Sequence, residues 1–131
     1  AWDAFDVFSA LRSLRHVLFL DSARRHPSLG RYSYVAAEPL EYCQFRAGDQ
    51  SLWSHLARWI KSCDSSVAQG LPKFQGGLAG LFGYDLGRSI ERLPEPRFDE
   101  FQCPAVALGR YDVVFAFDHV EKIPAHDFGR L

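Results

Sequence analysis

The chain has 131 residues, of which 47% are hydrophobic and 24% charged, and its 15 basic and 16 acidic residues give a net charge of −1. These values are typical of one globular domain with its own core, and they exclude a disordered chain, a collagen-like fibre and a charged tail. Neither a basic excess nor a long apolar run is present, so we expect no nucleic-acid partner and no membrane partner.

The first third of the chain alternates between helix and strand signals. Apolar residues at helical spacing predict a helix over 3–14, with Asp3 as its N-cap. A short apolar run predicts a strand over 16–22, and aromatic and β-branched residues predict another over 31–38. The polar stretch 23–30 between them predicts an exposed loop.

A third strand and a second helix are predicted next. Alternating residues predict a strand over 40–46, and a turn then offers Asp49 as the N-cap of a helix over 50–63. The helix is predicted from an apolar stripe formed by Leu52, Trp53, Leu56, Trp59 and Ile60.

The last third of the chain contains a glycine-rich segment and a long strand signal. Glycines among aromatic residues predict a bent strand over 74–83, followed by a helix that begins near Tyr84. Three prolines predict a loop over 93–104, and alternation predicts one strand over 105–119. The end, 121–131, has no strong pattern.

Together these elements predict an α+β fold. We expect mostly antiparallel strands packed as a two-layer sheet, with the helices 3–14 and 50–63 on the outside. The length predicts that residues 1–131 form a single domain.

The glycine segment invites comparison with a phosphate-binding loop. Gly77, Gly80 and Gly83 recur every three residues, and no Lys-Ser or Lys-Thr pair follows them. Known phosphate loops need a different spacing. We therefore expect a structural role, in which these glycines allow another backbone to approach closely.

No catalytic or metal-binding pattern stands out. A hydrolase triad of Ser22, His119 and Asp85 has no G-x-S-x-G sequence to support it. The histidines lack H-x-x-x-H spacing and the cysteines contain no CxxC pair, so we expect no metal site. An odd number of cysteines and no signal-like segment favour a reducing compartment, and we expect a cytoplasmic location.

One softer candidate is a small polar site between two predicted strands. Asp21 and Ser22 end the first strand, and Arg31 and Ser33 lie at the start of the next, beside Tyr32. Such residues could hold a small zwitterion, with Asp21 facing its ammonium group. The residues alone favour the other interpretation, in which Asp and Ser side chains cap the local backbone.

Four segments in order resemble the sequence of chorismate-utilising enzymes. The glycine-rich segment Phe74-Gln75-Gly76-Gly77 through Asp85-Leu86-Gly87-Arg88 and on to Leu93-Pro94 carries the most specific similarity. The others are Phe19-Leu20-Asp21-Ser22-Ala23, then Gly30-Arg31-Tyr32-Ser33-Tyr34 with Ala37-Glu38-Pro39, and Tyr111 to His119. They span nearly the whole chain.

The resemblance is to the N-terminal domain of component I, nearer to the para-aminobenzoate (aminodeoxychorismate) branch than to the anthranilate branch. It implies a part of an enzyme that aminates chorismate for folate synthesis, with a glutamine amidotransferase subunit as partner. In the family a C-terminal domain binds chorismate and Mg²⁺ and holds the catalytic groups, and its motifs do not occur here. The resemblance therefore implies that this chain alone is inactive and contains no cofactor.

The same resemblance implies a tryptophan pocket in this domain. Matched position by position, it would involve Leu20, Asp21, Ser22, Arg31, Tyr32 and Ser33. The C-terminal domain would complete the pocket. A regulatory domain of anthranilate synthase and a stand-alone amino-acid-binding module are the alternative functions.

Overall fold

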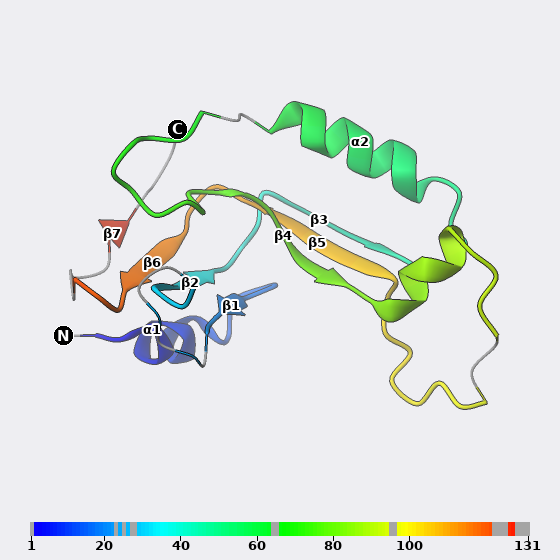
Figure 1. Ribbon diagram of the computed structural model, residues 1–131, viewed down its shortest axis with the longest axis horizontal. Helices are drawn as coiled ribbons and strands as arrows, with labels where there is room; N and C mark the ends of the chain where they lie inside the picture. Colours follow the sequence, from blue (N-terminus) through cyan, green and yellow to red (C-terminus); the bar gives the residue numbers. More distant parts are fainter. Residues whose placement is uncertain are drawn as a thin grey trace.

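A computed structural model describes most of the chain: residues 2–22, 24, 26, 29–63, 66–94 and 97–121, and the backbone of 126–127. Two small antiparallel sheets lie end to end along the molecule, and each has one α-helix on one face (Figure 1). This confirms the predicted α+β class. No helix in the described part of the chain has the length and apolar character needed to cross a membrane.

The first sheet, called sheet A here, holds the N-terminal part of the chain. Its antiparallel strands lie in the order β1 (Leu18–Leu20), β2 (Tyr32–Ala36), β6 (Phe115–Asp118) and β7 (His126–Asp127). Helix α1 (Ala4–Leu11) packs on one face of this sheet, where Ala4 contacts Val35 and Phe117 in a buried cluster. The predicted strand 16–22 is thus confirmed but shorter.

Helix α1 begins where the sequence indicates. Asp3 accepts a hydrogen bond from the backbone N–H of Asp6 (2.8 Å), and Asp6 accepts one from the backbone N–H of Asp3 (3.0 Å). This reciprocal cap satisfies two backbone donors that the helix itself cannot use. The helix ends at Leu11, before the predicted residue 14, because the chain turns there towards β1.

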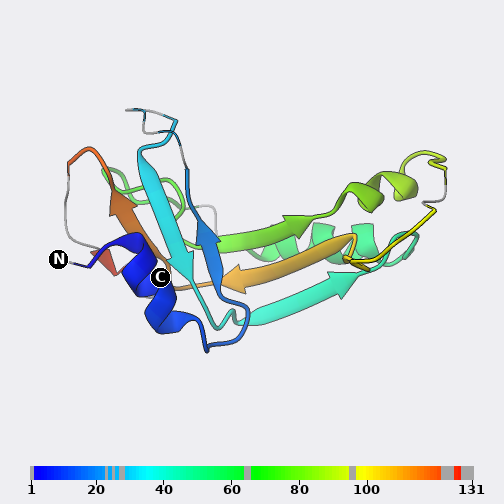
Figure 2. The ribbon, with the colours of Figure 1, turned by 90° about the horizontal axis from the view of Figure 1, so that it is seen from below.

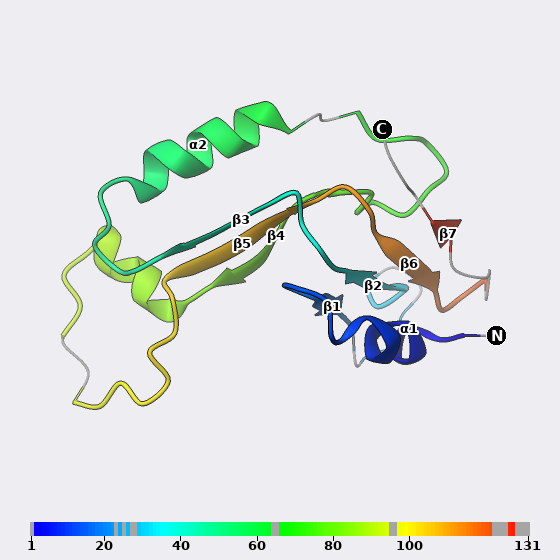
Figure 3. The same cartoon turned by 180° about the vertical axis from the view of Figure 1, so that it is seen from behind.

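The second sheet, called sheet B, is formed by the middle of the chain. Its antiparallel strands lie in the order β3 (Glu41–Phe45), β5 (Val106–Tyr111) and β4 (Gly77–Phe82). Helix α2 (Leu52–Ser62) covers one face through Leu52, Leu56 and Trp59 (Figure 3). The N-cap of α2 is Ser51, and Asp49 instead accepts hydrogen bonds from the Ser51 backbone N–H (2.9 Å) and hydroxyl (2.7 Å). The prediction of Asp49 as the cap was therefore wrong.

The predicted single strand 105–119 is two strands. The chain leaves sheet B after Tyr111 and enters sheet A at Phe115, and Figure 2 shows the bend between them. Val114 lies at this junction, buried with Ala36 and Tyr111. The Tyr111 hydroxyl also donates a hydrogen bond to the backbone oxygen of His16 (2.7 Å), which ties the two sheets together.

The glycine-rich strand β4 forms the close contact that the sequence predicts, but not at every glycine. A Cβ atom at Gly80 would lie 2.1 Å from the backbone oxygen of Ala107 on β5. Gly77 has no described atom within 4 Å of such a Cβ position, so its role is its positive φ of +111°. The helix expected near Tyr84 is a short 3₁₀ helix, η1 (Tyr84–Ser89).

The remaining predictions concern loops. Residues 93–94 and 97–104 form neither helix nor strand, as the prolines predict. Much of the predicted loop 23–30 and most of the segment 121–131 lie outside the described residues.

Candidate functional site

A polar cluster lies at the end of sheet A where β1 ends, β2 begins and β6 ends. At its centre, the Ser33 hydroxyl donates a hydrogen bond to the Asp21 carboxylate and lies 2.6 Å from Nε2 of His119. Ser33 has no exposed surface, whereas Asp21 is exposed. The hydroxyl has one proton, and that proton is used in the hydrogen bond to Asp21. In the contact with His119 the donor is therefore Nε2.

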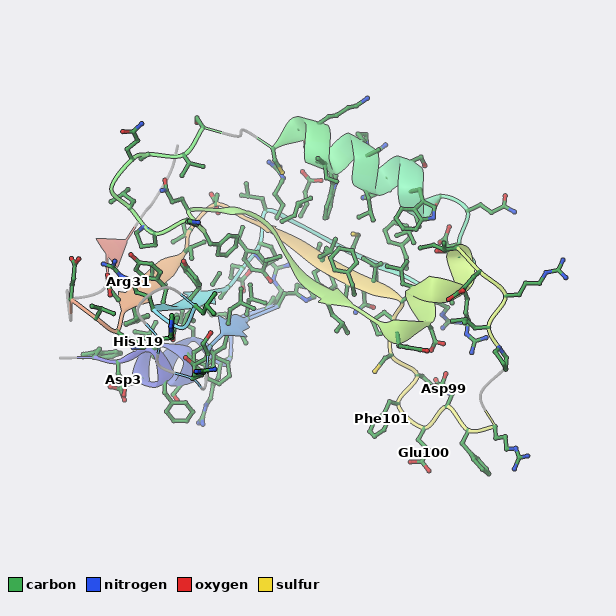
Figure 4. All side chains as sticks on the ribbon, in the orientation of Figure 1. Asp3, Arg31, Asp99, Glu100, Phe101 and His119 are labelled. Carbon is green, nitrogen blue, oxygen red and sulfur yellow. The ribbon has the colours of Figure 1, made fainter. Side chains whose placement is uncertain are left out.

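The strand register explains why these three residues meet. Leu20 pairs with Tyr34 and Ser33 pairs with Phe117, so the residues just after β1 and β6 flank the start of β2. The backbone N–H of His119 donates to the backbone oxygen of Arg31 (2.8 Å), which extends the ladder beyond β6. Figure 4 shows Arg31 and His119 at this end of the molecule.

An ion cluster lies beside this polar cluster. The Arg31 guanidinium donates to Asp118 (2.5 and 2.9 Å) and to Glu121 (2.7 Å). The other oxygen of Asp118 accepts from the backbone N–H groups of Val120 (2.9 Å) and Glu121 (3.2 Å). The hydrogen bonds from Arg31 are the main cause that lowers the pKa of Asp118 to about 2. Asp118 in turn raises the pKa of Arg31.

The predicted pocket residues lie on both faces of sheet A. Ser33 shares its face with Val35, which packs against α1, because alternate residues of a strand point the same way. Tyr32 and Tyr34 therefore point to the opposite face, where the Tyr34 and Phe74 rings form an edge-to-face pair at a centroid distance of 5.6 Å. The Arg31 guanidinium lies 5.0 Å from the Tyr32 ring centroid. Ser22, which follows Asp21, is half-buried.

Leu20 borders an apolar cavity of about 620 Å³ between α2 and β4. The cavity is lined by Leu20, Trp53, Leu56, Ala57, Ile60, Leu78, Ala79, Gly80, Phe82 and Leu108. Two side chains of the predicted helix stripe, Trp53 and Ile60, thus face this cavity and are not buried in the core. The exposed carboxylate of Asp21 follows Leu20 directly in the chain.

The structure does not assemble the hydrolase triad. Asp85 binds Arg88 (2.7 Å) on η1, at the end of sheet B that lies away from sheet A (Figure 1). His119 contacts Ser33, but this serine is fully buried and its hydroxyl donates a hydrogen bond to Asp21. A triad requires an accessible serine and an aspartate that orients the histidine. Among the described residues, no group of three His, Cys, Asp or Glu side chains could hold a metal ion.

Sequence reasoning found Asp21 and Ser33 but did not place His119, Asp118 or Glu121 beside them. The sequence does contain a signal, since Asp118 and His119 directly follow the alternating residues of a predicted strand. Polar residues at the end of a strand are candidates for a site at that edge of the sheet. The pairing of this strand with β2 is what brings the two groups together.

Comparison with known proteins gives consistent similarity to one group of enzymes. The chain is 46% identical over 130 residues to aminodeoxychorismate synthase component 1 of Salmonella typhimurium, covering 88% of this chain and 29% of that protein. It is 32% identical over 129 residues to the protein of the same name from Escherichia coli, covering 86% of this chain and 28% of that protein. It is 29% identical over 120 residues to anthranilate synthase component 1 of Mycobacterium tuberculosis, covering 78% of this chain and 23% of that protein. No family model matches the chain.

Proposed function

We propose that this chain, a homologue of aminodeoxychorismate synthase component 1 over most of its length, forms the N-terminal domain of an enzyme that converts chorismate to 4-amino-4-deoxychorismate for folate synthesis. The observation that carries the proposal is the similarity to two component 1 proteins of that name, over 86% and 88% of the chain. The chain spans less than a third of the length of these relatives. We therefore place the catalytic groups in a further domain.

The proposed partner is a glutamine amidotransferase that supplies ammonia. The relatives are numbered as component 1, and this implies a second component. The Mg²⁺ that the family resemblance implies would belong to the further domain, where that resemblance places it. This enzyme would act in the cytoplasm.

A regulatory domain of anthranilate synthase is the alternative function. It is supported by the similarity to anthranilate synthase component 1, which is lower, at 29% identity.

The experiment compares this chain with the polypeptide encoded by its complete reading frame. The purified longer protein, given chorismate, Mg²⁺ and ammonia, should form 4-amino-4-deoxychorismate, which chromatography separates from anthranilate. The 131-residue chain alone should form neither product. Release of anthranilate by the longer protein would establish the alternative branch, and turnover by the short chain would refute the division into two domains.

Tryptophan binding is a second proposal for the same domain. The exposed carboxylate of Asp21 is oriented by Ser33, and it follows Leu20, which borders an apolar cavity of a size typical for small-molecule sites. In this proposal Asp21 meets the ligand ammonium, the indole lies near Leu20 and Tyr32, and Ser22 donates to the ligand carboxylate. Arg31 is engaged by Asp118 and Glu121 in the structure, so it would contribute through its stacking on Tyr32. A stand-alone amino-acid-binding module would bind tryptophan with only these 131 residues.

A further inference from the structure

The strongest unexplained feature of the molecule is the surface formed by the outer edge of β4 and the neighbouring side of α2. We call it the β4–α2 groove and define it by the residues that line the apolar cavity. Its large side chains remain exposed, with 46% of Trp53, 65% of Ile60 and 58% of Phe82 accessible. Apolar side chains gathered around one cavity mark a surface that another molecule or segment covers.

The backbone of β4 is open along the same groove. Within the described residues, β4 pairs with β5 and with no other strand. The backbone N–H of Gly83 donates to the backbone oxygen of Ala105 (2.9 Å), just beyond the strand pair that ends with Phe82 opposite Val106. Hydrogen-bonded and non-hydrogen-bonded pairs alternate along an antiparallel ladder.

That alternation fixes which backbone groups of β4 face outwards. Ala79 and Leu81 are hydrogen-bonded to β5, so the N–H and C=O groups of Leu78, Gly80 and Phe82 point away from it. The same three residues line the apolar cavity. Open backbone groups and apolar side chains at alternate positions are what an added β-strand pairs with.

We propose that the β4–α2 groove receives a β-strand, with apolar side chains at alternate positions, from the part of the polypeptide that lies outside these 131 residues. This inference rests on the proposed function, since it requires a longer enzyme. The relatives support this occupant because the chain covers only 28% and 29% of their length. A segment of the same polypeptide also binds at a high effective concentration, so a short strand suffices.

Amide hydrogen exchange in the longer protein tests the proposal residue by residue. Ala79 and Leu81 serve as internal controls, because β5 already protects their amides. The amides of Leu78, Gly80 and Phe82 should exchange at rates within about tenfold of those controls, since each gains a hydrogen bond. Exchange at these three positions that is faster than the controls by more than about tenfold would overturn the added strand.

Two further observations identify the occupant. Protection that increases with protein concentration would show a second copy of the chain, and protection that appears only after addition of L-tryptophan would show a ligand. Either result would overturn the proposal. Phe82→Lys, which places a charge in the groove, should speed exchange at Leu78 and Gly80 by about tenfold or more. Phe98→Lys is the matched control, since Phe98 is 83% exposed and lies outside the groove, and it should leave exchange unchanged.

Amination of chorismate by the longer protein tests the proposed function separately from the added strand. Protection of the outward amides without amination of chorismate would refute the function and retain the strand. Amination with rapid exchange at these amides would retain the function and refute the strand. A natural chain with no residues beyond these 131 would leave no such strand and would also refute it.

Discussion

Replacing Gly80 by alanine should strongly destabilise the fold, because two separate penalties act at this position. The backbone of Gly80 has a φ of +152°, which L-residues rarely adopt, and the new Cβ would lie 2.1 Å from the backbone oxygen of Ala107. That oxygen belongs to the central strand of sheet B, so it cannot move aside as a flexible side chain would. Either β4 shifts away from β5 or both strands distort.

The magnitude follows from adding the two penalties. A residue forced into such a backbone region costs about 1–3 kcal/mol, and an atom inserted where no space exists costs about 1–3 kcal/mol more. The expected loss in the free energy of unfolding is therefore roughly 2–6 kcal/mol, a large share of the ~5–15 kcal/mol that stabilises a typical protein.

Gly77→Ala on the same strand provides the matched control. Gly77 also has a positive φ, +111°, but no described atom lies within 4 Å of the position of its Cβ. It should therefore lose only the backbone penalty of about 1–3 kcal/mol. Urea unfolding followed by circular dichroism measures both variants, with the slope checked for a change in the denatured state. If Gly80→Ala costs no more than Gly77→Ala, the close approach of β4 to β5 has no energetic weight and the reasoning is wrong.

Three further predictions concern the cluster in sheet A. The pKa of Asp118, lowered from 3.8 to about 2, contributes stability that is present above pH ~4 and is lost as the pH falls towards 2; acid titration of unfolding should show a loss of about 2 kcal/mol that Asp118→Asn lacks. Ser33→Ala should cost about 1–3 kcal/mol in thermal unfolding, since it removes a buried hydroxyl that hydrogen-bonds to the Asp21 carboxylate and contacts His119, whereas the exposed Ser54→Ala should cost less than about 0.5 kcal/mol. Asp21→Ala in the longer protein should weaken tryptophan binding roughly ten- to a hundredfold, as measured by calorimetry. Equal affinities of the wild type and the variant would show that Asp21 only caps the local backbone.

The helices could be predicted because their signals are local. The reciprocal cap of Asp3 and Asp6 and the apolar stripe of α2 lie within a few residues of the elements they specify. The end of α1 was less predictable, since apolar spacing continues to Leu14 although the helix stops at Leu11. The turn after Leu11 depends on how the chain reaches β1, and this is a tertiary requirement.

The break between β5 and β6 could not be predicted from alternation. An apolar run extends from Val113 to Phe117 without a turn signal, although the chain passes from one sheet to the other at 112–114. What determines the break is the burial of Val114 with Ala36, which is distant in sequence. Alternation relates only residues that are neighbours in the sequence, so it cannot reveal a junction that depends on a distant contact.

Only the part of the candidate site that the neighbouring strands β1 and β2 bring together could be predicted from the sequence. Asp21 and Ser33 are 12 residues apart and meet because β1 and β2 are adjacent strands. His119 is 86 residues from Ser33 and meets it through the pairing of β2 with β6, which depends on the whole topology.

The charged group and the apolar surface of the proposed tryptophan site lie on different faces of sheet A, although the sequence predicted them as one pocket. The Asp21 carboxylate is fixed from the α1 side of sheet A, through Ser33 and His119, so its orientation does not depend on a ligand. The apolar surface that a ligand or a further domain would use begins with Leu20, one residue earlier on the strand and therefore on the other face. The charged group and the apolar surface thus lie on opposite faces, so a ligand that contacts both must pass around the end of β1, where Asp21 follows Leu20.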